Sequence, residues 1–385
     1  MNILIVPSWH PTEENPGNGV FFLNQAAALK QAGHQVTFLC PHYTSPRELF
    51  TPQRAWIEEY EQFGVHMVVY ARPSWGANRL GLMCERTAGM MRDALRYASQ
   101  KYGPFDLIHA HSFMGAGYSV CRNRNVLNVP VVVTEHLSLI GQNRLTKRQI
   151  RDLQTTVESC DSFLAVSGNL KKDIEERTGI TGKIQVVPNM VSDVFQYTPE
   201  TGKLDSFTFI SAGSLIPDKG HGATIQAFCD AFPPEAGVQL LICGEGAQRG
   251  NLEALIAERH RTHQIQLLGQ KSQQELSMIM ARSHVFVLAS QHETFGVVYI
   301  EAMACGLPVI GTKNGGSDEV LSAYGATALE VGSQKQLSEA MTATHREYEG
   351  FDCERISREI RKMYSQEAVV RQLEAVYCKA IKTQL

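Results

Sequence analysis

The sequence has no long hydrophobic run, no paired cysteine motif and no excess of one charge. None of its apolar stretches approaches the 18 or more residues of a membrane span, and its start lacks the basic residues and the length of a signal peptide. We therefore expect a cytoplasmic protein. The nine cysteines include no CxxC pair, so they predict reduced core residues and no metal site. A net charge of −3 with both signs interspersed argues against a nucleic-acid partner.

Short apolar runs alternate with helical stretches along the chain, which indicates two α/β domains. The 385 residues are roughly twice what one such domain takes, and 43% of them are hydrophobic. Each half is predicted to be doubly wound around a largely parallel sheet. We place the first domain at 1–190 and the second at 191–360, and expect a helix over 361–385 that packs back on the first. The expected strands are 2–6, 36–39, 65–69, 107–110, 131–134, 162–166, 207–210, 238–242, 265–268, 285–288 and 308–311.

The most informative stretch is 289–319, which follows one of these predicted strands. From Gly296 the pattern predicts a helix, and its first amides, from Thr294 to Val297, would favour an anion together with the helix dipole. Two carboxylates flank that helix start, Glu293 before it and Glu301 within it. Because helical side chains lean toward the N-terminus, Glu301 is expected to accept hydrogen bonds from sugar hydroxyls near the start of this helix. The alternative is a solvated glutamate on an ordinary βα unit.

Three other positions follow predicted strands and are candidates for the same kind of ligand. Gly17 and Gly19 precede a helix and could let backbone amides approach a phosphate, although a plain loop is the more common meaning of such glycines. The spacing is not GxGxxG, which disfavours a dinucleotide oxidoreductase. Lys219 lies on a glycine-bearing loop and could meet a diphosphate, with a solvated surface lysine as the alternative.

Three further polar residues follow strands of the first half. His111 has small sequence neighbours and is expected to be accessible, with a satisfied core histidine as the rival interpretation. Glu135 and His136 follow the strand 131–134 and could line an acceptor site. Since ligands of such sheets gather at the carboxyl ends of the strands, we expect the two domains to share one cleft.

Taken together, these motifs resemble the retaining glycosyltransferases of family 4. The resemblance covers nearly the whole chain and is most specific in the GluX7Glu motif of 293–301. It implies the GT-B fold, with two facing Rossmann-like domains and a C-terminal helix that crosses back to the first. The supporting segments are the glycine loop 17–19, AspLeuIleHisAlaHisSer (106–112), PheLeuAlaValSer (163–167), ValValProAsnMetVal (186–191), GlySerLeuIleProAspLysGly (213–220), CysGlyGluGly (243–246) and AsnGlyGlySerAspGlu (314–319).

The resemblance also implies roles for individual residues. Glu301 would bind the ribose hydroxyls of a nucleotide-sugar donor, and Glu293 hydroxyls of the transferred sugar. Lys219 would neutralise the diphosphate, and His111 would lie by the reacting carbon, so these two and Glu293 are the predicted catalytic residues. The remaining predicted donor contacts are Gly17, Gly19 and Ser214, the amides at Thr294, Phe295, Gly296 and Val297, and the backbone at Gly269 and Gln270 for the base. The predicted acceptor contacts are Glu135 and His136.

One position departs from the family pattern. Where GlyArgLeu is usual, the chain has Gly213, Ser214 and Leu215, so the diphosphate loses a charged contact worth roughly 1.5–3 kcal/mol. Three outcomes are open: Lys219 and the amides suffice, another basic residue such as Arg249 compensates, or activity is reduced. Compensation is the outcome we favour.

The predicted function is sugar transfer with retention from a UDP- or GDP-sugar to a glycan or lipid-linked acceptor in cell-surface polysaccharide synthesis, without cofactor or metal. The helical stretch 79–101 carries arginines among apolar positions and could rest on the inner face of the membrane, although packing on its own sheet is the more common use of such a helix. Alternatives of another class are a sugar-nucleotide 2-epimerase, which needs no acceptor, and a donor-binding subunit without turnover. The donor base, the sugar and the acceptor stay open.

Overall fold

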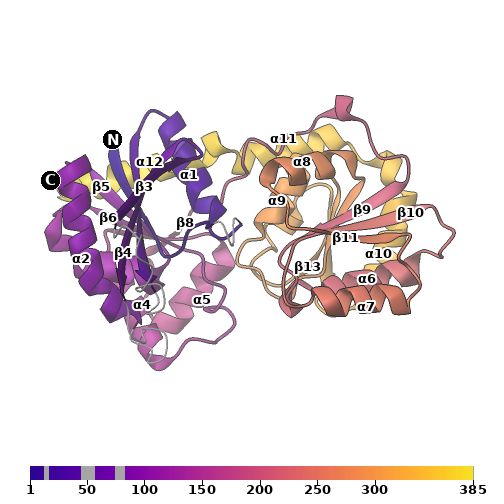
Figure 1. The fold of residues 1–385 in the computed structure, drawn as a ribbon, viewed down its shortest axis with the longest axis horizontal. Coiled ribbons are helices and arrows are strands. Elements are labelled where there is room, and N and C mark those ends of the chain that lie inside the picture. Colours follow the sequence, from indigo (N-terminus) through magenta and orange to yellow (C-terminus); the bar gives the residue numbers. More distant parts are fainter. Residues whose placement is uncertain (13–16, 45–56, 74–82, 385) are drawn as a thin grey trace, which may run out of the picture. The chain divides into compact units, whose positions relative to one another are not determined.

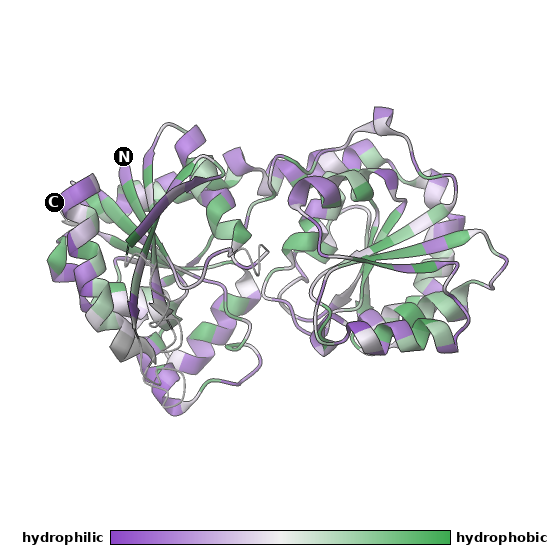
Figure 2. Cartoon of the chain, viewed as in Figure 1, coloured by the Kyte–Doolittle hydropathy of each residue, from purple (hydrophilic) through white to green (hydrophobic). Residues whose placement is uncertain are grey.

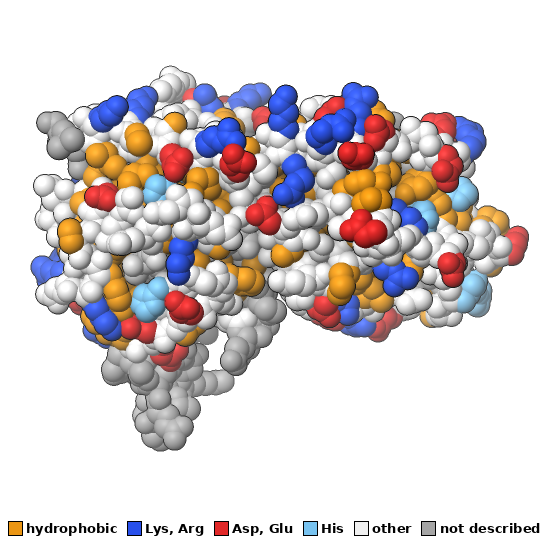
Figure 3. All heavy atoms as spheres, turned by 90° about the horizontal axis from the view of Figure 1, so that it is seen from above, with side chains coloured by type: hydrophobic (Ala, Val, Ile, Leu, Met, Phe, Trp, Pro, Cys, Tyr) orange, Lys and Arg blue, Asp and Glu red, His pale blue; other side chains and the backbone are white. Residues whose placement is uncertain are grey.

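The computed structural model describes residues 1–12, 17–44, 57–73 and 83–384, which form two compact units. Unit 1 comprises residues 1–190 together with 369–385, and unit 2 comprises residues 191–368. In each unit most strands are hydrophobic, and the helices around them carry many of the polar residues (Figure 2). The described part of the chain contains no helix that is long and apolar enough to cross a membrane. On the face drawn in Figure 3, acidic and basic side chains are interspersed, as the net charge suggested.

Unit 1 is built on an eight-stranded sheet within the described residues, in the order β3-β4-β2-β1-β5-β6-β7-β8 (Figure 1). All neighbouring strands are parallel except the pair β3 and β4. Parallel neighbours require crossovers, and helices supply most of them. The strands are β1 (Asn2–Pro7), β2 (Gln35–Thr44), β3 (Ile57–Gln62), β4 (Val65–Pro73), β5 (Leu107–His111), β6 (Val131–Glu135), β7 (Ser162–Ala165) and β8 (Ile184–Val186). The helices are α1 (Val20–Gln31), α2 (Met83–Tyr102), α3 (Tyr118–Arg122), α4 (Lys147–Ser159), α5 (Gly168–Thr178) and α12 (Gln366–Gln384).

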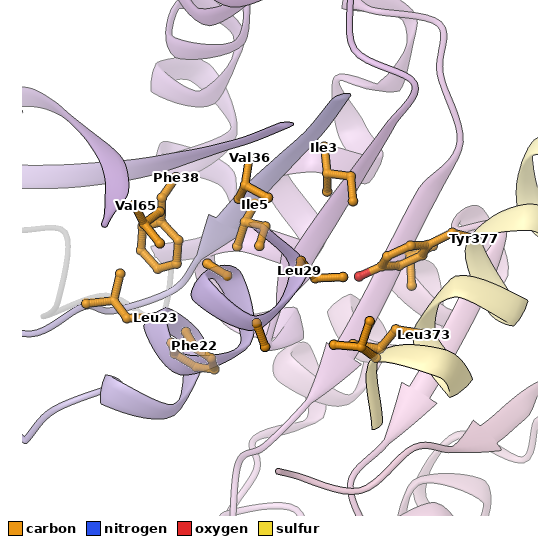
Figure 4. Close-up of a cluster of buried hydrophobic side chains, with 14 of the residues drawn as sticks. Ile3, Ile5, Phe22, Leu23, Leu29, Val36, Phe38, Val65, Leu373 and Tyr377 are labelled. Atoms are coloured by element: carbon orange, nitrogen blue, oxygen red, sulfur yellow. The ribbon is translucent and has the colours of Figure 1, made fainter. Parts of the chain in front are cut away.

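The C-terminal helix α12 completes the core of unit 1. Leu373 and Tyr377 of α12 lie in the same buried cluster as Ile3 of β1 and Leu29 of α1 (Figure 4). The Tyr377 hydroxyl lies 2.7 Å from Nδ1 of the buried His109, which ties α12 to β5. The predicted contact of the C-terminal helix with the first domain is therefore confirmed.

Unit 2 has a six-stranded, wholly parallel sheet in the order β11-β10-β9-β12-β13-β14 (Figure 1). The helix α6 packs against α10, and α9 packs against α11. The strands are β9 (Phe207–Ala212), β10 (Val238–Cys243), β11 (Ile265–Gly269), β12 (Val285–Leu288), β13 (Val309–Lys313) and β14 (Ala326–Glu330). The helices are α6 (His221–Ala231), α7 (Arg249–Glu258), α8 (Gln273–Arg282), α9 (Val297–Ala304), α10 (Gln334–Arg346) and α11 (Cys353–Tyr364).

The predicted fold class, with two parallel α/β sheets, is confirmed, and each expected strand is present. The sequence did not predict β3, β8 or β14. The β3 segment, IleGluGluTyrGluGln, is mostly exposed and lies at the sheet edge, so it lacks the buried run that marks a parallel strand. The predicted helix 79–101 corresponds to α2, and residues 79–82 lie outside the described part of the chain.

Candidate functional site

In unit 2 the predicted donor residues lie at one edge of the sheet. The strands β9, β11 and β12 run parallel, so their carboxyl ends meet at that edge. Ser214 and the short 3₁₀ helix Pro217–Lys219 follow β9, Gln270 follows β11, and Glu293 follows β12. The topology therefore gathers segments that are distant in the sequence.

Close backbone approach joins the loop after β9 to the loop after β12. The amide of Gln291 donates a hydrogen bond to the carbonyl of Asp218 at 2.7 Å. A Cβ on Gly220 would lie 2.0 Å from the carbonyl oxygen of Ala289, and a Cβ on Gly316 would lie 1.8 Å from that of Glu293. Only glycine fits at either position. Gly220 therefore sets the separation between the segments that carry Lys219 and Glu293, and Gly316 sets that between Glu293 and the loop after β13.

Lys219 and Glu293 form an ion pair in this edge. The Lys219 ammonium lies 2.6 Å from a carboxylate oxygen of Glu293, and the two side chains are 24% and 10% exposed. The sequence named both residues but gave them separate partners. Its pattern held no sign of the pair, because the two are 74 positions apart and meet only through the fold.

The helix α9 begins as the sequence predicted, directly after Gly296. Gly296 is left-handed, with φ 84° and ψ 55°, and no side chain of the described residues caps the helix start. A larger residue at Gly296 would also meet the ring of Tyr299, whose Cδ2 is 2.6 Å from the position of a Cβ. The uncapped start leaves the amides of Val297 and Val298 without the carbonyl of a preceding helical turn, which is the arrangement that favours an anion.

Glu301 lies one turn into α9 and is nearly buried, at 8% exposure. Burial raises the pKa of its carboxyl to about 8, and a hydrogen bond with Gln273 acts in the opposite direction. At neutral pH the carboxyl of the ligand-free protein is therefore mostly protonated. A group of hydroxyl donors placed beside it would favour the ionised form and lower this pKa.

The remaining predicted donor residues of unit 2 lie on the same strand ends. Gly269 ends β11 and its carbonyl accepts the amide of Gly244 at 2.9 Å, while Gln270 and Ser214 are exposed. Arg249, the expected substitute for the missing arginine, has its guanidinium 2.6 Å from Glu245 and 2.9 Å from Glu253. Two carboxylates thus already hold its charge.

His221 was not singled out from the sequence and lies in the same loop. It is the first residue of α6, its side chain is buried, and Nδ1 is 3.3 Å from the Ser211 hydroxyl. Its Nε2 has no hydrogen-bond partner among the described residues. Burial lowers the pKa of the imidazole to about 4, and the charge of Lys219 acts in the same direction, while the nearby backbone of Gly213 and Ser214 acts in the opposite one. The sequence signal that could have identified His221 was its position two residues after Lys219.

In unit 1 the predicted glycines lie at the start of α1. Gly19 is left-handed, with φ 77°, and precedes the first helical residue, and no described side chain caps this helix. Trp9 packs so closely that its Cδ1 would be 2.9 Å from a Cβ on Gly19. Gly17 is exposed in the preceding turn. The contact of the two glycines with a phosphate stays a prediction.

His111 ends β5 and is fully buried, so the expectation that it would be accessible is wrong. Its neighbours in sequence are small, but its neighbours in space are rings: Phe22 lies 4.7 Å and His136 5.3 Å away between centroids. The Nδ1 of His111 is 3.1 Å from Nε2 of His136. Burial, and to a smaller extent His109 and His136, hold the pKa of His111 well below its ordinary value.

Glu135 and His136 follow β6, and both are buried. The Glu135 carboxylate accepts the backbone amides of Phe113, His136 and Leu137 at 2.7–2.8 Å. These bonds fix the loop after β5 to the end of β6, although burial still raises the pKa of Glu135. Their predicted contacts with an acceptor stay a prediction. Within the described residues no three His, Cys, Asp or Glu side chains are grouped so as to hold a metal ion.

Two family models match the chain in consecutive halves. Residues 17–194 match the Glycosyltransferase Family 4 model, and residues 196–363 match the glycosyl transferases group 1 model. The chain belongs to this glycosyltransferase family. The resemblance inferred from the GluX7Glu motif is thereby confirmed.

Similar proteins cover much of the chain at low identity. The GPI3 subunit of phosphatidylinositol N-acetylglucosaminyltransferase from Saccharomyces cerevisiae is 24% identical over 72% of this chain, and the chain spans about 64% of that relative's length. A putative teichuronic acid biosynthesis glycosyltransferase, TuaC of Bacillus subtilis, is 25% identical over 89% of this chain and 88% of its own.

Solved structures share the fold across the full length. Sucrose-phosphate synthase from Thermosynechococcus elongatus superposes with a TM-score of 0.79 at 19% identity and covers both chains completely. HepE of Anabaena in complex with UDP gives a TM-score of 0.76 at 16% identity, over 97% of this chain and 99% of its own. The GT-B fold class is therefore that of this chain.

Proposed function

We propose that the protein is a retaining glycosyltransferase that moves a sugar from a UDP- or GDP-sugar to a glycan or lipid-linked acceptor in cell-surface polysaccharide synthesis. The observation that carries the proposal is the Lys219–Glu293 ion pair beside the uncapped start of α9. The two charges match the two ends of a sugar diphosphate, since an ammonium suits the phosphates and a carboxylate suits the sugar hydroxyls.

Donor binding would exchange the partners of this pair. Lys219 turns to the diphosphate, and Glu293 accepts hydrogen bonds from the transferred sugar. The amides at the start of α9 share the phosphate charge, while Glu301 accepts from the ribose hydroxyls. When the bond to the sugar breaks, negative charge grows on the departing diphosphate, so groups already aimed at it lower the barrier to transfer.

We further propose that the reaction needs no metal ion, because amides and Lys219 can take the role of neutralising the leaving group. Retention follows if the acceptor hydroxyl attacks from the face that the diphosphate leaves. UDP is the first nucleotide to test, since the HepE structure holds UDP. The names of the GPI3 and TuaC relatives support a lipid or a cell-surface polysaccharide as acceptor. The inner face of the membrane is the place that we propose for such a transfer.

Replacement of Lys219 tests the assignment. Lys219→Met should lower kcat about 10²–10³-fold and weaken UDP binding by a smaller factor, because the charge matters most when the diphosphate departs. Steady-state kinetics with UDP-sugars, and isothermal titration with UDP, would measure the two effects. Lys335→Met, a change at an 86% exposed lysine of α10, is the matched control. Equal turnover in all three proteins would remove Lys219 from the diphosphate site.

Two further measurements separate the competing functions. Product analysis distinguishes transfer from epimerisation: free UDP that appears only with acceptor supports transfer, whereas a changed sugar nucleotide indicates an epimerase. EDTA should leave the rate unchanged if the leaving group is neutralised by protein groups. A complete loss of activity that Mg²⁺ restores would contradict the metal-free mechanism.

A further inference from the structure

The loop after β9 contains a polar atom that the fold leaves unsatisfied. Nε2 of His221 is buried and has no hydrogen-bond partner among the described residues, although a buried polar group without a partner is costly. The rest of the ring is fixed, since Nδ1 lies 3.3 Å from the Ser211 hydroxyl at the end of β9. The contact of Nδ1 with Ser211 therefore fixes the direction in which Nε2 points.

That direction leads to the diphosphate loop. Nε2 of His221 is 3.8 Å from the point where a Cβ would stand on Gly213, and the Cγ and Cδ atoms of Lys219 are 3.7 Å from the same point. The imidazole of His221 and the aliphatic part of the Lys219 side chain therefore converge beside Gly213, and the Lys219 ammonium extends from there to Glu293. The next residue is Ser214, the exposed position at which the family pattern has an arginine.

The charge of that arginine has no other substitute in the immediate loop. Arg249 is held by Glu245 and Glu253. The family pattern has both the arginine and a lysine in this loop, so Lys219 corresponds to that lysine and does not replace the arginine. We propose that His221 supplies the missing charge: when a nucleoside diphosphate binds, the imidazole takes up a proton from solvent and, as an imidazolium beside Lys219, stabilises the diphosphate. This inference rests on the proposed function and adds a donor-binding residue to it.

The electrostatics of the loop fit a charge that appears only with the ligand. Among the described residues Lys219 is the one charged side chain that acts on the imidazole, and its charge opposes protonation, as burial does. The backbone of Gly213 and Ser214 favours protonation but does not outweigh burial. The pKa of His221 is therefore about 4 in the free protein, and the residue is neutral at pH 7. A diphosphate reverses the local field, because it outweighs the charge of Lys219 and brings oxygen acceptors.

Isothermal titration with UDP near pH 6.5, in two buffers of different ionisation enthalpy, measures the protons exchanged on binding. We expect wild type to take up about half a proton more per UDP than His221→Gln, because an imidazole returned to its ordinary pKa is half protonated there. The difference between the two proteins cancels the titration of UDP itself. His263→Gln, which alters an exposed histidine of the same unit, should behave as wild type.

Equal proton exchange in wild type and His221→Gln, with UDP bound by both, would overturn the role of His221 and leave the proposed function intact. Absence of UDP binding to wild type would instead reject the proposed donor, and the inference with it. If His221→Gln does not fold, proton NMR of wild type decides: a histidine resonance with a pKa near 4 should titrate above pH 6 once UDP is added, and an unchanged set of histidine pKa values would refute the proposal.

Discussion

Glu301 holds a proton at neutral pH because α9 carries its carboxyl into the interior of unit 2. The raised pKa makes this residue a sensor of what lies at the helix start. Hydroxyl donors from a ribose would stabilise the carboxylate, so nucleotide binding at neutral pH should release a proton from Glu301 while His221 takes one up. The two residues give opposite signs in a proton count, and single variants separate them.

The stability of the ligand-free protein should reflect the same carboxyl. A buried acid with a raised pKa binds more protons in the folded state, so its contribution is fully present below about pH 4.5 and is lost as the pH rises to about 8. We expect the free energy of unfolding to fall over this window by no more than about 5 kcal/mol in wild type. In Glu301→Gln this part of the slope should disappear. Urea unfolding at several pH values would measure it, and parallel curves for both proteins would reject the raised pKa.

Ser214 gives a second test at the residue scale. The residue is exposed, so an arginine can be accommodated there. Ser214→Arg should tighten UDP binding by about 10- to 100-fold, since a charge-assisted hydrogen bond contributes about 1.5–3 kcal/mol. Ser214→Gln, which adds length without charge, is the control, and isothermal titration supplies the affinities. An arginine that adds nothing would mean that the diphosphate lies away from this loop.

At the scale of elements, the βα units could be predicted from the sequence, but the contacts between them could not. Apolar runs such as 285–288 and the glycine before Val297 locate a strand and a helix start, because burial and backbone conformation constrain the residues locally. The Lys219–Glu293 pair and the rings around His111 depend on which strands become neighbours, and no local pattern contains that information. The polar edge strand β3 was not predicted for a related reason, because most of its side chains face solvent and not a core.

The loop contacts at the strand ends can be tested through Gly316. Its backbone is not left-handed, so Gly316→Ala is disfavoured by the close approach of the backbone of Glu293 and Thr294, where a Cβ would lie 1.8 Å from the Glu293 carbonyl oxygen. We expect a loss of about 1–3 kcal/mol in stability and a large loss of UDP affinity, because the segment with Glu293 must move. Gly250→Ala in α7, where a Cβ meets nothing within 4 Å, should stabilise the protein by up to about 1 kcal/mol. Similar denaturation curves for the two variants would contradict the close approach.

The anchoring of α12 gives another prediction at this scale. Tyr377→Phe removes the hydroxyl that lies 2.7 Å from Nδ1 of His109, and leaves the ring in the core. The variant should lose about 1–2 kcal/mol of stability, which a buried polar contact of this kind contributes. Since unit 1 carries the contact, UDP affinity should stay within about threefold of wild type, as a titration would show.

For the whole molecule, the division into units has a functional meaning. Every predicted contact with the nucleotide and diphosphate except Gly17 and Gly19 lies in residues 191–368, one continuous segment with its own hydrophobic core. The amide of Val191 and the carbonyl of Tyr364, 2.8 Å apart, join the two ends of this segment. A fragment of residues 191–368 should therefore fold and bind UDP within about tenfold of the full chain, yet transfer no sugar. A fragment that folds but ignores UDP would place the nucleotide elsewhere.

Unit 1 is interrupted in the chain, since its final helix is encoded after the whole of unit 2. During translation roughly 180 residues are synthesised between the sheet of unit 1 and α12, and for that time the apolar surface that α12 covers is exposed. Chaperones can bind this exposed apolar surface during that interval. A ribosome that terminates before α12 would release unit 2 attached to an incomplete unit 1.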